Sequence, residues 1–206
     1  DSAQSEVLQY EIAQLRMTSG NNIVSSGLMP YDEANIQERL LDYDLAFGWV
    51  LFGDSDVGQG TDSSGYATGS FEVQPGDSVP QFGFTSNADA GGDGSTIDLS
   101  EASINGGELI FSLRILSGAI PNFEVRLDAA DGTFAVVELN SNMYGAMASY
   151  DWQEFSFNLG DFSAVDLTSI ERITIAPDSA QSEVLQYEIA QLRMTSITGT
   201  DGGTDG

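Results

Sequence analysis

The 206-residue chain contains no cysteine, no histidine and no lysine. Without cysteine it can form no disulfide, no thiolate metal site and no iron–sulfur cluster. Without histidine it has no imidazole for acid–base catalysis, for a Ser-His-Asp triad or for metal ligation. Without lysine it has no Schiff-base amine and no phosphate-loop lysine. The chemistry that remains is that of carboxylates, hard cations and neutral ligands.

Positive charge is scarce as well. Six arginines face 32 acidic residues, so the formal net charge is −26 at pH 7. A surface of this sign repels phosphate backbones, which excludes nucleic acid as a partner. It also disfavours anionic membranes and acidic polysaccharides unless calcium bridges them. No apolar run approaches the ~18 residues of a membrane span, so we expect no membrane insertion. An acidic, lysine-free surface favours an extracellular location, either secreted or on a cell surface.

The most distinctive feature of the sequence is a verbatim internal repeat. Residues 1–19 and 178–196 both read DSAQSEVLQYEIAQLRMTS, at a spacing of 177 residues. One such spacing has the size of a domain, so the chain resembles a piece of a tandem array of near-identical domains. Segments rich in Gly, Ser, Asn and Asp follow each copy and are typical of linkers. We therefore expect a duplicated strand segment at 1–19, a linker at 20–27, a β-sandwich domain at 28–196 and a Gly/Asp-rich linker at 197–206.

The pattern within the repeat predicts a strand. Leu185, Tyr187 and Ile189 alternate with polar residues, and Leu192 and Met194 continue on the opposite parity, as after a bulge. The composition also suits a helix. Two identical strands cannot fill one place in one sheet. The first copy is therefore the last strand of a preceding repeat, or a donor strand that pairs beside its twin or in another copy of the chain. The remaining alternative is that residues 1–19 are simply part of a neighbouring repeat that was included at the boundary of this sequence.

Short alternating segments separated by turn signals fill the rest of the chain. They predict strands over residues 47–52, 66–73, 79–85, 108–116, 122–127, 133–139, 152–159 and 170–175. A short helix is expected over 32–44, where Asp32 is a plausible N-cap and Ile36, Leu40 and Leu41 share a face. No strand–helix–strand alternation occurs, which excludes α/β folds. The sequence predicts an all-β antiparallel sandwich of jelly-roll type with at most one short helix.

The second half of the chain resembles a known family. Residues 97–115 join IDLS to the strand-like GELIFSLRI, residues 152–162 read WQEFSFNLGDF, and DLTSI at 166–170 precedes the closing strand with IAQLRM at 189–194. These elements resemble the galactose-binding-like jelly rolls that serve as carbohydrate-binding modules, most of all those appended to bacterial β-glucan-degrading enzymes. The resemblance implies a polysaccharide-binding domain without a catalytic role, which often carries a structural calcium ion.

Sugar binding needs exposed aromatic faces and amides that bond to hydroxyl groups. Loop tyrosines are therefore the first candidates, with neighbouring amides beside them. Both tryptophans stand in strand-like runs, where aromatic residues usually belong to the core, and Trp49 is kept as a ligand candidate. For each of these residues, the alternative to sugar binding is ordinary packing within the protein. The candidate ligand residues are Tyr66, Tyr144, Tyr150, Trp49, Asn140, Asn142 and Gln153.

Two acidic loops are candidates for a calcium ion. Residues 87–98 place oxygen-bearing side chains at EF-hand spacing, but glycine stands at the fifth position, aspartate at the twelfth, and no helix is expected to follow. An irregular calcium loop fits better than an EF-hand, and residues 54–62 form a second, weaker cluster. The alternative for both is a solvated acidic turn. The candidate metal ligands are Asn87, Asp89, Asp93, Asp98, Asp54 and Asp56.

Carboxylate catalysis is the one enzymatic route left, and no pair of acidic residues is distinguished by its spacing. We therefore expect no enzyme, but a carbohydrate-binding module of a secreted multidomain protein, with neutral polysaccharides of the β-glucan class as first expected ligands. The alternative is a structural repeat of an extracellular adhesin, surface-layer or filament protein. Such repeats would join through calcium and through strand exchange, with copies of the chain itself as partners via residues 1–19.

Overall fold

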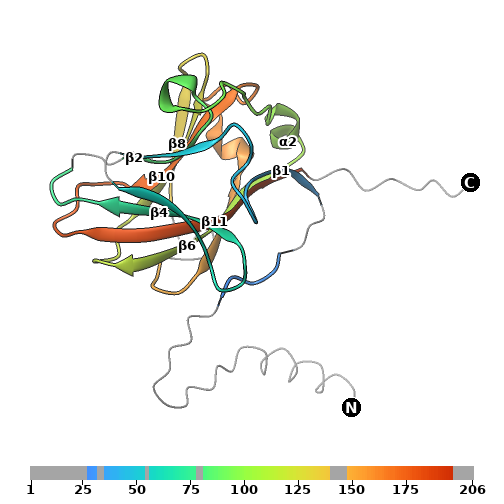
Figure 1. The fold of residues 1–206 in the computed structure, drawn as a ribbon. Helices are drawn as coiled ribbons and strands as arrows, with labels where there is room; N and C mark the ends of the chain where they lie inside the picture. The colour runs from blue at the N-terminus through green and yellow to red at the C-terminus, as the bar shows by residue number, and fades with distance from the viewer. Residues whose placement is uncertain (1–26, 32–34, 54–55, 78–80, 140–147, 197–206) are drawn as a thin grey trace, which may run out of the picture.

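Two antiparallel β-sheets pack face to face in the computed structural model (Figure 1). The structure describes residues 27–31, 35–53, 56–77, 81–139 and 148–196. The predictions for residues 1–19, for Asn140, Asn142 and Tyr144, for Asp54 and for the linker at 197–206 lie outside the described residues. Within the described residues the prediction of an all-β antiparallel sandwich is confirmed.

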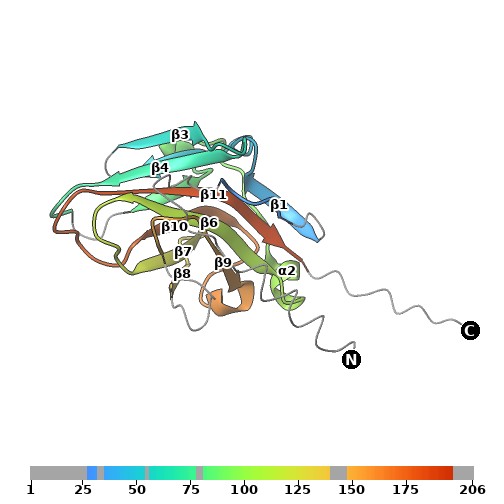
Figure 2. The same cartoon turned by 90° about the horizontal axis from the view of Figure 1, so that it is seen from below.

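The first sheet has six strands and is seen from its outer side in Figure 2. Its main path runs β3 (Val57–Thr61), β4 (Ala67–Val73), β11 (Leu185–Thr195), β6 (Glu108–Ser117) and β9 (Gln153–Asn158). The sixth strand, β1 (Ile36–Leu41), also pairs with β11. On one edge of β11, β4 pairs with residues 185–190 and β1 with residues 192–195, while β6 pairs along the other edge. The second copy of the duplicated sequence therefore forms the central strand of this sheet.

The second sheet has five strands in the order β2 (Val50–Gly53), β5 (Phe82–Thr85), β10 (Ile170–Pro177), β7 (Phe123–Ala129) and β8 (Phe134–Glu138). In the described residues, short helical elements lie between strands: η1 (Ala88–Ala90), α2 (Ser100–Ile104) and η2 (Leu159–Phe162). None of the helices in the described part of the chain is long and apolar enough to cross a membrane.

The core lies between the two sheets because alternate residues of each strand point inward. On β6 the alternating residues Leu109, Phe111, Leu113 and Ile115 are all buried. Tyr187 of β11 joins the two layers: its ring stacks on Phe71 with centroids 5.2 Å apart, and its hydroxyl donates to the carbonyl of Ile175 in β10 at 2.8 Å. Burial raises the pKa of the Tyr187 hydroxyl well above its usual value.

Strand β11 contains the predicted bulge. Its register with β6 shifts between Ala190 and Arg193, and Gln191 has a positive φ of 54°. The extra residue changes the parity of the strand, so Leu192 and Met194 enter the core after Leu185, Tyr187 and Ile189. The Gln191 side chain accepts a hydrogen bond from Ser112 Oγ at 3.0 Å and donates to the carbonyl of Met29 at 2.8 Å.

The prediction of a helix over residues 32–44 is wrong. Residues 36–41 form strand β1, which pairs with the part of β11 that β4 leaves open. Register shifts in this pairing bury both Leu40 and Leu41, and the resulting spacing of apolar residues imitates one face of a helix. Tertiary pairing has therefore overridden the local pattern.

Two further elements were not predicted from the sequence. Strand β3 has the sequence VGQGT and is exposed along its whole length, so it lacks the apolar alternation that reveals a strand. Helix α2 follows directly after the candidate calcium loop, where no helix was expected. It is short and buries only Ala102.

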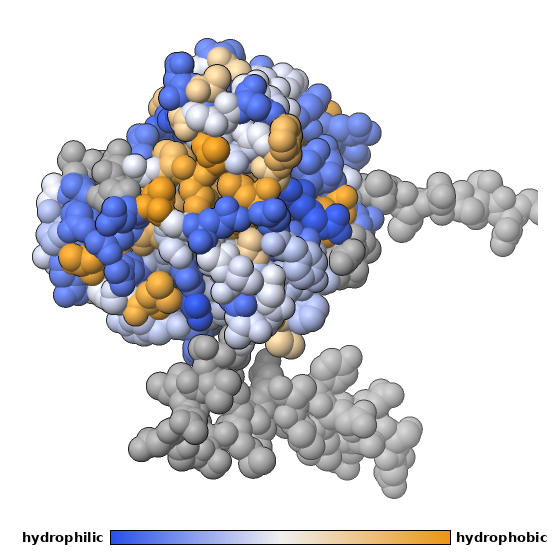
Figure 3. All heavy atoms as spheres, in the orientation of Figure 1, coloured by the Kyte–Doolittle hydropathy of each residue, from blue (hydrophilic) through white to orange (hydrophobic). Residues whose placement is uncertain are grey.

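The surface is chemically mixed. Figure 3 shows apolar side chains in a band across the face in view, bordered by strongly hydrophilic ones. Several large apolar residues reach solvent, and Phe47 is 96% exposed. Single exposed apolar residues are normal on soluble domains and do not by themselves mark a site.

A core truncation tests the layer arrangement. Phe157 of β9 is fully buried, and its ring stacks on Phe111 with centroids 5.7 Å apart. Phe157→Ala removes the ring and leaves a cavity, so we expect it to lower the free energy of unfolding by about 3–5 kcal/mol in urea titrations. The control Phe47→Ala should change it by less than about 0.5 kcal/mol. Equal losses from the two variants would contradict this assignment of the core.

Candidate functional site

The outward face of the six-stranded sheet carries a row of connected polar side chains. Gly58, Ser70, Glu188 and Arg114 are successive cross-strand neighbours on β3, β4, β11 and β6. Ser70 Oγ donates to Glu188 Oε1 at 3.1 Å, and Arg114 Nε donates to Glu188 Oε2 at 2.8 Å. The Glu188 carboxylate is thus held in place from both sides on the solvent face of the sheet.

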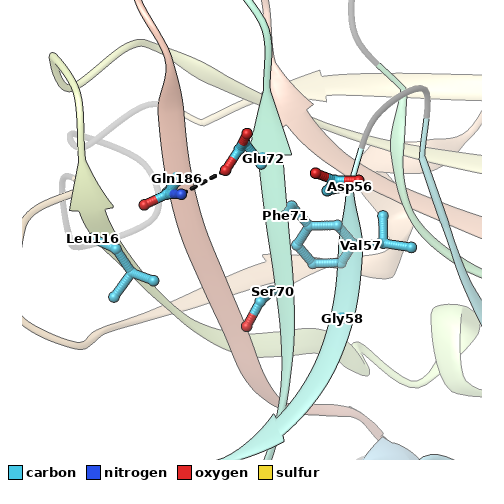
Figure 4. A pocket seen from close by; sticks show the side chains of 8 residues that line it. All are labelled: Asp56, Val57, Gly58, Ser70, Phe71, Glu72, Leu116 and Gln186. Atoms are coloured by element: carbon cyan, nitrogen blue, oxygen red, sulfur yellow. Dashed lines mark hydrogen bonds between the residues drawn. The ribbon is translucent and has the colours of Figure 1, made fainter.

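An open pocket of about 280 Å³ lies on this face (Figure 4). Gln186 Nε2 donates to Glu72 Oε2 at 2.5 Å across its floor, and Leu116 lies on the β6 side. On the β3 side, Gly58 has no side chain, and no atom lies within 4 Å of the place where a Cβ would stand. The pocket is lined by Asp56, Val57, Gly58, Ser70, Phe71, Glu72, Leu116 and Gln186.

An aromatic cluster covers the neighbouring part of the same face. Tyr66, Leu28 and Ala190 form a small buried cluster against which Tyr31 and Trp152 pack. Ala190 lies two residues along β11 from Glu188, so the cluster adjoins the polar row. Tyr43 stacks on Tyr66 with ring centroids 5.0 Å apart and an interplanar angle of 17°. Tyr66 is only 6% exposed, but Tyr43 is 65% exposed and presents its outer side to solvent.

Two arginines support the aromatic rings from the sheet. The guanidinium carbon of Arg114 lies 4.6 Å from the ring centroid of Trp152, and that of Arg193 lies 4.1 Å from the ring of Tyr31. Arg193 also donates to Glu154 Oε2 at 2.8 Å. Both cations are therefore paired with a carboxylate and an aromatic face, which fixes the rings and leaves no unpaired positive charge at these two positions.

Burial raises the pKa of Tyr31 to about 12, with a further contribution from the nearby Asp42 carboxylate and an opposing one from Arg39. Burial also raises the pKa of Tyr66, and the hydrogen bond with Tyr43 acts in the same direction. Both hydroxyls therefore remain protonated at neutral pH and keep a proton that can be donated.

The structure distributes the predicted ligand residues over several places. Tyr66 lies in the aromatic cluster. Tyr150 is 59% exposed, and its hydroxyl donates to the carbonyl of Gly118, after the end of β6. Gln153 begins β9 and pairs with Leu113. Trp49 is 6% exposed and belongs to the main core, which corrects its inclusion among the ligand candidates.

Three of the predicted metal ligands accept hydrogen bonds from backbone amides two residues further along the chain, and Asn87 also donates to Glu171 of β10. Asn87 Oδ1 accepts from the amide of Asp89 at the start of η1. Asp93 accepts from the amide of Ser95, and Asp98 from both the amide and the hydroxyl of Ser100. Hydrogen bonds from these serines lower the pKa of both carboxyls. No three acidic side chains of the described segments gather as a metal site would require. Asp56 lies in the wall of the pocket, and bound calcium stays a prediction.

Sequence reasoning missed most of the residues on this face. It searched loops, whereas the polar row stands on strands. A signal was present in the duplicated segment, where Gln186 and Glu188 alternate with core residues and must therefore face outward. Tyr31 directly precedes residues 32–44 and Tyr43 lies within them, and the helix predicted there does not bring either ring to Tyr66.

No protein-family model matches this sequence, and no curated protein matches it either. Solved structures do share its fold. The family 30 carbohydrate-binding module of a cellulosomal cellulase of Clostridium thermocellum superimposes with a TM-score of 0.55 at 16% identity, covering 79% of this chain and 99% of that one. CtCBM11 gives a TM-score of 0.53 at 10% identity, covering 82% of this chain and 100% of that one.

A structure of an exo-β-agarase gives a TM-score of 0.54 at 13% identity, covering 80% of this chain and 26% of the agarase. The described chain therefore has the jelly-roll fold of carbohydrate-binding modules, as the resemblance of its second half implied. At these identities the comparison establishes the fold alone.

The raised pKa of Tyr31 predicts a pH dependence of stability. Its folded pKa of about 12 exceeds the ordinary value of 10.0, so its contribution is complete below pH 10 and is lost as the pH rises from 10 towards 12. We expect the free energy of unfolding of Tyr31→Phe to fall less over this interval than that of the unchanged chain. Urea titrations between pH 9 and 12 measure both slopes. Parallel slopes would show that Tyr31 is not buried in this way.

Proposed function

We propose that this domain is a carbohydrate-binding module without catalytic activity, which holds a neutral polysaccharide across the outward face of the six-stranded sheet. One observation carries the proposal: an exposed aromatic ring, Tyr43, stands on the same face as an open pocket with fixed polar groups. A sugar ring has an apolar C–H side that stacks on aromatic rings and hydroxyls that need hydrogen-bonding partners. Tyr43 supplies the first, and Ser70, Glu72 and Gln186 supply the second.

Charge supports a neutral ligand. Glu72 and Asp56 line the pocket, and the arginine next to it, Arg114, is paired with Glu188. An anionic polymer would meet carboxylates without a free cation to balance them. We take β-glucans as the first class of ligand. Agarose is the second neutral polymer to compare, because the domain of an agarase has the same fold.

The titration of the carboxyls supports a role without catalysis. A glycosidase needs a carboxylic acid whose pKa is raised so that it can protonate the leaving group. Burial raises the pKa of the Glu124 carboxyl, the charge of Asp178 acts in the same direction, and Arg126 acts against it. Glu124 lies on β7 of the five-stranded sheet, whereas the pocket lies on the six-stranded sheet.

Affinity electrophoresis of the full chain tests the proposal. Native polyacrylamide gels would contain laminarin, mixed-linkage glucan, xylan, agarose or alginate. We expect retardation by a neutral β-glucan and none by alginate, which is anionic. Tyr43→Ala should weaken binding roughly tenfold, which corresponds to about 1.4 kcal/mol. The control Phe134→Ala removes an exposed ring from β8 of the other sheet and should leave retardation unchanged. Free migration in every gel would refute a polysaccharide-binding function.

The same gels run with Ca²⁺ and with EDTA test the predicted calcium. We propose that the protein is secreted and extracellular and that it binds a structural calcium ion. Such an ion would make retardation or the melting temperature depend on Ca²⁺. Identical behaviour under both conditions would remove calcium from the proposal and leave the carbohydrate site as it is.

Filling the pocket tests the position of the ligand. Gly58→Ile adds a side chain into empty space on an exposed edge strand, so the fold should be unaffected. We expect at least a tenfold loss of affinity at an unchanged melting temperature, with a smaller loss for the matched control Gly58→Ala. Unchanged affinity in Gly58→Ile would show that the polysaccharide binds elsewhere.

A further inference from the structure

The position of β11 is the most demanding in the domain. Five of its side chains, Leu185, Tyr187, Ile189, Leu192 and Met194, are fully or almost fully buried. Its backbone pairs with β4 and β1 on one edge and with β6 on the other. A strand that fills this position must therefore present the right residues on both faces and carry the bulge at the right place.

The chain contains a second sequence that meets all of these demands. Residues 8–18 are identical to residues 185–195, so Tyr10 corresponds to Tyr187 and Gln14 to the bulge residue Gln191. Each contact that β11 makes through its side chains is available to the first copy without alteration. The domain thus has one position for this strand and two sequences that fit it equally well.

The connections to the two copies differ in length. Residues 178–184 link β10 to β11, and the longer segment 19–35 would link the first copy to β1. The second connection has a suitable geometry, because β1 is antiparallel to β11 and the amide of Ser196 already donates to the carbonyl of Asn35. The entropic cost of closing a loop grows only slowly with its length. Chain connectivity therefore does not exclude the first copy.

Order of synthesis also favours the first copy. Residues 1–19 precede strands β1 to β10 in the order of synthesis, and residues 178–196 follow them. Strands β1 to β10 consequently meet the first copy while the second does not yet exist.

We propose that residues 1–19 are a second occupant of the β11 position in their own chain. The domain closes with either copy, and when the first copy is in place, residues 178–196 are released as a free strand. The exchange leaves the outward face unchanged, because Gln9 and Glu11 take the places of Gln186 and Glu188. This inference goes beyond the proposed binding function and does not depend on it.

Disabling one copy at a time tests the proposal. Tyr187 is fully buried against Phe71 and Phe123, so an aspartate in its place would put a charge into the core. In the full chain we expect Tyr187→Asp and Tyr10→Asp each to retain a cooperative thermal transition close to that of the unchanged chain. The double variant should lose the transition, as should the control Phe157→Asp, whose strand has no second copy. Loss of the transition in Tyr187→Asp alone would overturn the proposal.

Cysteine trapping identifies the occupant directly, since the chain has no cysteine of its own. Gln186 stands opposite Glu72 across β11 and β4. In the Tyr187→Asp background, Gln9→Cys with Glu72→Cys should form a disulfide within one monomeric chain. In the Tyr10→Asp background, Gln186→Cys with Glu72→Cys should form the equivalent disulfide. A disulfide between two chains, or a dimer in light scattering, would overturn the assignment to the same chain. Absence of the disulfide in the first pair would do so as well.

Discussion

The burial of β11 between neighbouring strands on both edges and against the opposite sheet is the constraint on which the rest of the structure depends. Its inner side chains form the centre of the core, and the hydroxyl of Tyr187 reaches across to β10. Its outer side chains form the middle of the polar row. The same strand therefore contributes both to the stability of the domain and to the polar groups on its exposed face. The bulge at Gln191 makes this possible, because it lets the strand change parity without leaving the sheet.

The two halves of the exposed face follow from what each strand offers outward. Towards β3 the outward positions are small or polar, and the surface is open where Gly58 stands opposite Ser70. Beyond Ala190 the segment at residues 28–31 crosses the sheet, anchored by Gln191 at Met29 and by Asp62 at the amide of Leu28. Tyr66 and its neighbours then close that part of the face. An open polar half beside a ring-covered half is an asymmetric surface that can orient a chain-like ligand.

The sequence predicts this fold well where strands alternate, and poorly where pairing alone creates the strand. The segment 108–116 appears as β6 almost unchanged, since its inward residues are large and apolar. Strand β3 offers no such pattern, and β1 exists because β11 leaves an edge unpaired. The site was harder to predict for the same reason: Tyr43 and Tyr66 come together only once β1 lies beside β11. Outward polar residues such as Glu188 could be recognised as exposed, but not as partners of Arg114.

The contact of the arginine side chains with aromatic rings has a consequence for the electric field around the domain. Arg114 and Arg193 lie against rings and carboxylates, Arg126 lies over Phe134 and is paired with Asp128, and Arg172 lies over Phe52. Most of the scarce positive charge is thus used in local contacts, and the outer field is that of a polyanion. Such a particle repels its own copies at low ionic strength, and at physiological salt concentration the repulsion is screened beyond a Debye length of about 8 Å. Several such domains in one chain would repel one another at low ionic strength and would approach one another more closely at high salt concentration.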